Sequence, residues 1–255
     1  MYYCREEKCS RAVIVLTPSE SKKLIAKGVA ALPEVQQALK SATIFISSGS
    51  TNSYIVEELT GKEVKTEHYT VGRILEGWLA VNPEETRLNG IALEKGKPRE
   101  MIPGQLPEEF SADDVLLKGA NAVDPEGNAA ILAGHPAGGT IGSYWVRMFS
   151  QGGHVIVPVG LEKLVPSVIR ACAETGQKKW DYHMGLPVAL IPISGAGVFT
   201  EIQALEVLYD VEAVQIAAGG IMGSEGSVVL AVSGESDNIR RMWDDVNALK
   251  EIQKD

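Results

Sequence analysis

The sequence has no apolar run that approaches about 18 residues, which excludes a conventional transmembrane helix. The segment before Arg11 is polar and contains no apolar signal-peptide core. Cysteine is scarce, with three in 255 residues, so a disulfide framework is not expected. We therefore predict a cytoplasmic protein without a membrane partner, in which Cys4 and Cys9 remain reduced.

Basic residues are not in excess, because 24 Lys and Arg stand against 33 Asp and Glu, for a net charge of −9. Nucleic-acid binding requires a basic surface, so this class of partner is excluded. No GxSxG hydrolase motif and no GK[ST] phosphate-loop motif occurs, and the histidines and cysteines show neither HxxxH nor CxxC spacing. The sequence therefore predicts no metal site and no cofactor.

Aliphatic residues and 26 glycines dominate what is present, which is typical of strands joined by tight turns. Thr17, Pro18 and Glu20 form a capping box that starts a helix, and Gly61 ends another. Strands are expected at 11–16, 43–46, 88–93, 113–117, 129–133, 154–159, 188–193, 213–217 and 227–232. Further helices are expected at 34–39, 166–175, 200–208 and 238–250, and one that runs through Phe149 from the Gly-rich segment at 134–142. The order predicts an α/β fold, with an open, mainly parallel sheet flanked by helices over 11–180 and a smaller α+β, ferredoxin-like lobe over 181–255.

The turn between the strand at 43–46 and the next helix carries the strongest functional signal. Its residues Ser48, Gly49, Ser50, Thr51 and Asn52 present amides and hydroxyls at a helix N-terminus, which suits a phosphate or carboxylate. The alternative is that Ser50 or Thr51 only caps the helix.

Two further segments carry polar residues after predicted strands, where ligands bind in open α/β sheets. Lys118 is a candidate anion partner, Asn121 a hydrogen-bonding group and Asp124 a candidate base, although Asp124 before Pro125 also fits an Asx turn. His135 is a candidate acid–base group, since histidine titrates near neutral pH. Gly138, Gly139 and Thr140 follow it as candidate ligand-binding residues, or as a loop that needs unusual φ angles.

Four segments together resemble the type A ribose-5-phosphate isomerases: SSGSTNSY at 47–54, KGANAVDP at 118–125, LPVALIPIS at 186–194 and SESKKLIAKG at 19–28. The resemblance implies the wider fold shared by sugar-phosphate isomerases, deaminases and CoA-transferase-like proteins. It also implies that Lys22, in the first helix, closes the site over a ligand.

The departures from that family bear on activity. Lys118 and Asn121 stand where the family has two aspartates, no lysine lies between Gly119 and Glu162, and no carboxylate lies between Gly127 and Leu161. Proton transfer through an enediol needs a positioned base, so we expect no ribose-5-phosphate isomerase activity. The exchanges instead make the site more favourable for anions.

Three hypotheses remain, and whether the chain is an enzyme stays open. The first is a protein, expected to be a homo-oligomer, that binds a small anionic metabolite, phosphorylated or carboxylated. The second is acyl or CoA transfer, for which Glu162 is the candidate nucleophile. The third is a structural relic that has lost its site.

Overall fold

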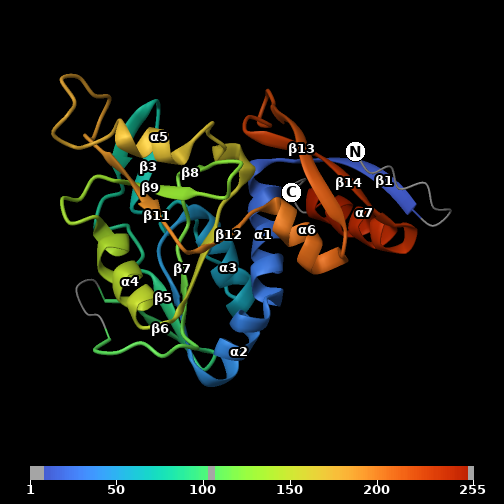
Figure 1. The fold of residues 1–255 in the computed structure, drawn as a ribbon, viewed down its shortest axis with the longest axis horizontal. Coiled ribbons are helices and arrows are strands. Elements are labelled where there is room, and N and C mark those ends of the chain that lie inside the picture. The colour runs from blue at the N-terminus through green and yellow to red at the C-terminus, as the bar shows by residue number, and fades with distance from the viewer. Residues whose placement is uncertain (1–8, 103–106, 252–255) are drawn as a thin grey trace.

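The computed structural model describes residues 9–102 and 107–251, and it confirms a mixture of helices and strands around a main six-stranded sheet (Figure 1). The strand order in this sheet is β12-β10-β7-β2-β5-β6. Its members are β2 (Thr43–Ile46), β5 (Ile91–Glu94), β6 (Lys97–Glu100), β7 (Val115–Leu117), β10 (His154–Pro158) and β12 (Gly197–Phe199). The pairs β12–β10, β10–β7 and β7–β2 are parallel, whereas β5 and β6 extend the sheet as antiparallel strands.

Most predicted helices are present close to their expected bounds. They are α1 (Pro18–Ala31), α2 (Pro33–Ser41), α3 (Ser50–Thr60), α4 (Gly139–Ser150), α5 (Val168–Ala173), α6 (Glu201–Tyr209) and α7 (Ser236–Glu251), with a short 3₁₀ helix at Leu161–Lys163. The capping box of Thr17 and Glu20 starts α1 as expected. Gly61 ends α3 with a φ of 66°, a conformation that favours glycine.

A second sheet is antiparallel and has the order β1-β14-β13. Its strands are β1 (Cys9–Leu16), β14 (Ser227–Glu235) and β13 (Glu212–Gly219). The strand at 188–193 was expected beside the two last strands, but β11 (Ala189–Ile193) pairs instead with β9 (Ala129–Ala133), which also pairs with β8 (Ala122–Val123). The third strand of the antiparallel sheet is instead the N-terminal strand β1, which pairs with β14 over eight residues.

The segment 72–81 forms a hairpin of β3 (Gly72–Leu75) and β4 (Trp78–Val81). None of the helices within residues 9–102 and 107–251 is long and apolar enough to cross a membrane. Cys9 is disulfide-bonded, which contradicts the expected free thiol, while Cys4 lies outside the described residues. That expectation rested on the polar tail and on the predicted compartment, and neither determines whether a second thiol lies within reach of Cys9.

One continuous core joins the two sheets, and α1 lies between them (Figure 1). Leu24, Ile25 and Val29 on α1 are fully buried, and α1 packs against α3 and α6. In α7, Ile239, Met242, Val246 and Leu249 form the predicted buried stripe. Trp243 was expected to belong to it but is 47% exposed, because it lies at the margin of the stripe.

Gly28 sets the close approach of α1 to α6. A Cβ atom at this position would lie 2.8 Å from the Ala204 Cβ and 2.9 Å from the Phe199 ring. We expect Gly28→Val to lower the free energy of unfolding by about 2 kcal/mol or more, since overpacking a rigid contact costs roughly 1–3 kcal/mol. Urea unfolding measures it, and Ala31→Val on the exposed side of α1 is the control. Equal losses in both variants would contradict close packing at Gly28.

The outer face of the antiparallel sheet exposes aliphatic side chains. Val13 and Val15 on β1 and Val214 and Ile216 on β13 are between 43% and 63% exposed. Contiguous apolar surface of this kind is typical of interaction sites. The expected homo-oligomer stays a prediction.

Candidate functional site at the carboxyl edge of the sheet

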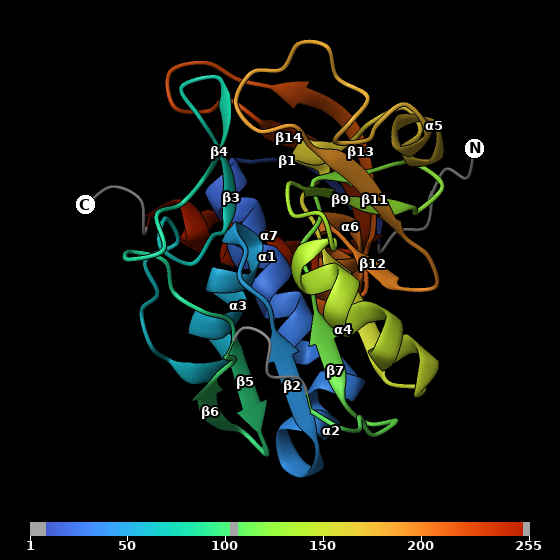
Figure 2. The ribbon, with the colours of Figure 1, turned by 90° about the vertical axis from the view of Figure 1, so that its left-hand side faces the viewer.

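Four parallel strands, β2, β7, β10 and β12, end at the same edge of the main sheet, here called the carboxyl edge. Figure 2 shows β2 and β7 side by side and pointing to this edge. The segments that follow these strands are 47–52, 118–121, 159–163 and 200–201. The carboxyl edge of an open α/β sheet is where ligands bind, so the side chains gathered here define the candidate site.

The turn at 47–52 is held to the neighbouring strand by hydrogen bonds to one carbonyl. The Ser47 amide and hydroxyl both donate to the Leu117 carbonyl, at 3.1 and 2.9 Å. The Asn52 Nδ2 donates to the same carbonyl at 3.0 Å and to the Ser47 carbonyl at 2.7 Å. Asn52 is completely buried, so its amide group braces the turn. Its Oδ1 has no hydrogen-bond partner in the described part of the chain.

The N-terminus of α3 is open at this turn. Gly49 is the N-cap residue, its own amide donates to the Tyr69 carbonyl at 2.7 Å, and no side chain caps the helix. Among the described residues, no acceptor is found for the amides of Ser50, Thr51 and Asn52. Three free N–H groups at the positive end of a helix dipole can bind an oxyanion. Ser50 and Thr51 do not act as the N-cap, which was the alternative.

Tyr69 contacts the strand that precedes the turn, and the sequence did not indicate this residue. Its hydroxyl donates to the Ile46 carbonyl at 2.8 Å and accepts from the Ile91 amide at 3.1 Å. The side chain is fully buried, and burial raises the pKa of the Tyr69 hydroxyl well above its usual value. The neutral hydroxyl therefore links β2 to β5 just before the turn.

Lys118 directly follows β7, one residue after the carbonyl that holds the turn. Its backbone amide donates to the Ile156 carbonyl on β10 at 3.1 Å. Within the described ranges, its ammonium group has no ion pair and no hydrogen bond. The residue is partly buried. Desolvation and the nearby charge of Lys163 lower the pKa of Lys118 to about 8.

Lys118 belongs to a group of charged side chains that we call the lysine–glutamate cluster: Lys22, Lys118, Glu162, Lys163 and Glu201. The Lys163 ammonium donates to the Ala120 carbonyl at 3.0 Å. Burial lowers the pKa of Lys163. The charges of Glu162 and Glu201 raise this pKa, whereas the charge of Lys22 lowers it. Lys22, expected only from the resemblance to close the site, thus lies near the carboxyl edge.

Glu201 is the most enclosed member of the cluster. It is fully buried, and its carboxylate accepts from the Leu161 amide at 2.9 and 3.2 Å. Burial raises the pKa of Glu201, against hydrogen bonds from Ser21 and Leu161 that lower it. Glu201 thereby ties the start of α6 to the end of β10 and to α1. Glu201 was missed because the strand before it, β12, was not predicted, and Lys163 was missed although the adjacent Glu162 was a candidate.

Asn121 and Asp124 lie further along the chain and serve the β8–β9 unit. The Asn121 Oδ1 accepts from the Leu132 amide at 3.0 Å. The Asp124 carboxylate accepts from the Asn128 and Val168 amides, both at 2.9 Å, and from the Asn128 side chain. Burial opposes ionisation of Asp124, but these hydrogen bonds outweigh it and lower the pKa. Asp124 is thus the expected Asx-turn carboxylate, and its role as a base stays a prediction.

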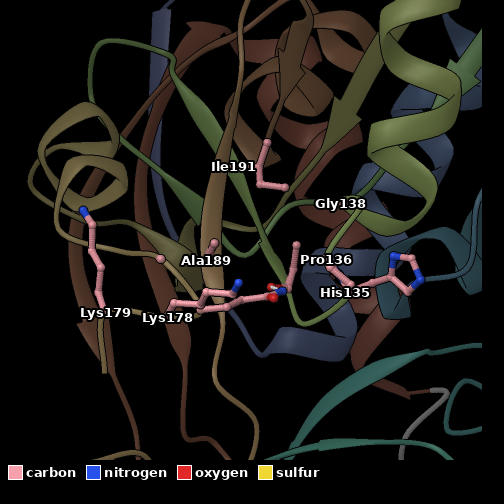
Figure 3. A pocket seen from close by; sticks show the side chains of 10 residues that line it. His135, Pro136, Gly138, Lys178, Lys179, Ala189 and Ile191 are labelled. Carbon is pink, nitrogen blue, oxygen red and sulfur yellow. Dashed lines mark hydrogen bonds between the residues drawn. The ribbon is translucent and has the colours of Figure 1, made fainter. Parts of the chain in front are cut away.

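His135 lies on the exposed loop between β9 and α4, and its Nδ1 accepts from the Ala137 amide at 3.1 Å. With Gly138, Gln177, Lys178 and Lys179 it lines an open surface cavity of about 340 Å³. Figure 3 shows His135 at one end of this group and Lys179 at the other.

Gly138 is the N-cap residue of α4, and Gly139 begins the helix. Gly138 and Gly139 have φ angles of 74° and 58°. These values agree with the alternative, which was a loop that needs unusual φ angles. The side chain of Thr140 lies outside the described part of the chain. Among the residues that the structure describes, no hydrogen bond or ion pair joins this loop to the lysine–glutamate cluster, so the ligand-binding role of the loop stays a prediction.

In residues 9–102 and 107–251, no group of three or more His, Cys, Asp or Glu side chains is placed to hold a metal ion. No protein-family model matches the chain, and neither a curated protein nor a solved structure matches it.

Proposed function

We propose that the chain binds a small phosphorylated or carboxylated metabolite, with the anionic group on the amides of Ser50, Thr51 and Asn52 and against the Lys118 ammonium. The observation that carries this proposal is the shared Leu117 carbonyl. It accepts hydrogen bonds from the turn at 47–52, and the next residue is Lys118, whose ammonium group has no ion pair or hydrogen bond with any described residue. An anion in this position would satisfy both the open helix N-terminus and the lysine.

Charge supports the proposal locally although the chain as a whole is acidic. The cluster contains three lysines and two glutamates, and burial raises the pKa of Glu201, which favours its neutral form. The net charge of −9 opposes the approach of an anion only weakly, because physiological salt screens exposed charges beyond about 8 Å. A second anionic group on the ligand would find Lys163 and Lys22.

Acyl or CoA transfer through Glu162 is the second candidate function, favoured by the position of Glu162 on the same edge. The Glu162 carboxylate lies close to the backbone of Gly226, because a Cβ atom at position 226 would be 3.5 Å from the Glu162 Oε2. A thioester assay with acetyl-CoA and a carboxylate acceptor tests this function. Transfer that is lost in Glu162→Gln would favour it over simple binding.

Calorimetric titration with inorganic phosphate and with a sugar phosphate tests the first proposal. We expect Lys118→Met to weaken binding by about 10- to 100-fold, since a charge-assisted hydrogen bond contributes roughly 1.5–3 kcal/mol. Ser50→Ala/Thr51→Ala should weaken binding less, because the backbone amides remain. Lys97→Met, at an exposed lysine on β6, is the matched control and should leave the affinity unchanged. If the wild type binds neither ligand, the anion site is wrong, and transfer through Glu162 and the structural relic remain as the alternatives.

A further inference from the structure

The Lys118 amine is placed to act as a nucleophile as well as a charge. Lys118 follows Leu117, whose carbonyl holds the turn at 47–52, and none of the residues that the structure describes forms an ion pair or hydrogen bond with the amine. Its neighbour Lys163 is different, because its ammonium group donates to the Ala120 carbonyl. The Lys163 ammonium is therefore held by a hydrogen bond, whereas among the described residues nothing holds the Lys118 amine.

We infer that Lys118 forms a Schiff base with the carbonyl carbon of a phosphorylated aldehyde or ketone whose phosphate lies on the turn at 47–52. This inference rests on the proposed anion site and names the class of ligand that the site takes. The geometry that supports it is the succession of Leu117, whose carbonyl holds the turn, and Lys118, which directly follows at the carboxyl end of β7.

The chemistry needs no partner beyond the amine and the carbonyl. The neutral nitrogen attacks the carbonyl carbon, a C–N bond forms, and the carbonyl oxygen takes up a proton to give a carbinolamine. The nitrogen then loses its remaining proton, the hydroxyl leaves as water, and a C=N bond replaces the C=O bond. Lysines beside a second cationic group, in a desolvated position, are suited to this reaction because more of the amine is neutral.

The fraction of neutral amine favours Lys118 over an ordinary lysine. At pH 7.5, about one quarter of an amine with a pKa of about 8 is neutral, against about one thousandth for a lysine with the ordinary pKa of 10.5. Burial and the charge of Lys163 lower the pKa of Lys118. The pKa of Lys163 depends in turn on the charges of Glu162, Lys22 and Glu201. Removing the charge of Lys163 should therefore move the reactive range of Lys118 to higher pH.

Reductive trapping tests the inference. The full chain is treated with glycolaldehyde phosphate and sodium borohydride, which delivers a hydride to the imine carbon, and modified lysines are mapped by mass spectrometry. We expect at least tenfold more label on Lys118 than on any other lysine, competition by inorganic phosphate, and weaker labelling with unphosphorylated glycolaldehyde. Lys163→Met should shift the half-maximal pH of labelling upward.

Lys118→Arg separates this inference from the proposed anion site. Arginine keeps the positive charge, so phosphate binding should persist in calorimetry while the labelling at position 118 is lost. If the wild type binds phosphate but label is spread evenly over surface lysines, the Schiff base is excluded and the anion site stands. If neither phosphate binding nor selective label is observed, both are excluded.

Discussion

Lys118→Met is expected to make the protein more stable at neutral pH, although it removes the central residue of the proposed site. The pKa of Lys118 falls from 10.5 to about 8 on folding, and such a shift amounts to about 3 kcal/mol of unfavourable free energy for the charged form. Below pH 8 both the folded and the unfolded chain carry this proton, so the full penalty applies. Allowing for side-chain differences, we expect a gain of about 1–3 kcal/mol in the free energy of unfolding.

The pH dependence of this gain identifies its cause. Between pH 8 and 10.5 the unfolded chain binds more protons at this lysine than the folded chain, so wild-type stability rises with pH through this group. The advantage of the variant should therefore shrink as the pH rises from about 8. Urea unfolding at about pH 7 and pH 9.5 measures it, with Lys97→Met as the exposed control. A variant that is less stable than the wild type at pH 7 would contradict the desolvated amine.

Asp124→Ala is expected to lower the free energy of unfolding by about 3–4 kcal/mol. The carboxylate is 3% exposed and accepts hydrogen bonds from the Asn128 amide, the Asn128 side chain and the Val168 amide. The Val168 amide is buried and would lose its acceptor, which adds a desolvation penalty to the lost bonds. Asp124→Asn keeps part of this network and should lose about half as much.

The sign of the pH effect is opposite to that of Lys118. The pKa of Asp124 is lowered in the folded chain, so its contribution to stability is complete above the ordinary aspartate pKa of 3.8 and is lost as the pH falls through the folded pKa. Thermal unfolding of the wild type and Asp124→Ala should therefore differ by a constant amount between about pH 5 and 8 and converge in stronger acid. A variant that loses phosphate binding but no stability would show instead that Asp124 serves the ligand.

The helices and most strands could be predicted because capping residues, glycines or apolar runs in the sequence mark where each of these elements begins or ends. Thr17 with Glu20 starts α1, Gly61 ends α3, and the run at 43–46 coincides with β2. The hairpin at 72–81 was not predicted, because its turn is Glu76-Gly77, without the Asn-Gly or Asp-Gly pair that usually marks such turns. β12 was missed because three residues are too few to show a period.

Pairing between distant segments has no local signal. β1 and β14 are separated by about two hundred residues, and only the alternation of buried positions such as Ile14 and Leu230 fits them to one sheet. The same limit applies to the site. The turn at 47–52 and Lys118 could be predicted because both follow recognisable strands, whereas Glu201 follows the unpredicted β12. Asp124 and His135 lie on segments that leave the main sheet for β8 and β9.

Amide chemical shifts test the proposed anion site most directly, because they report on the donors themselves. In a ¹⁵N–¹H spectrum of the full chain titrated with inorganic phosphate, the amide signals of Ser50, Thr51 and Asn52 should move in a saturable manner. The Lys118→Met variant should require at least tenfold more phosphate for the same change, whereas Lys97→Met should match the wild type. If these three amides do not move, or the largest shifts lie around His135 and Lys178, the anion site at the carboxyl edge is wrong.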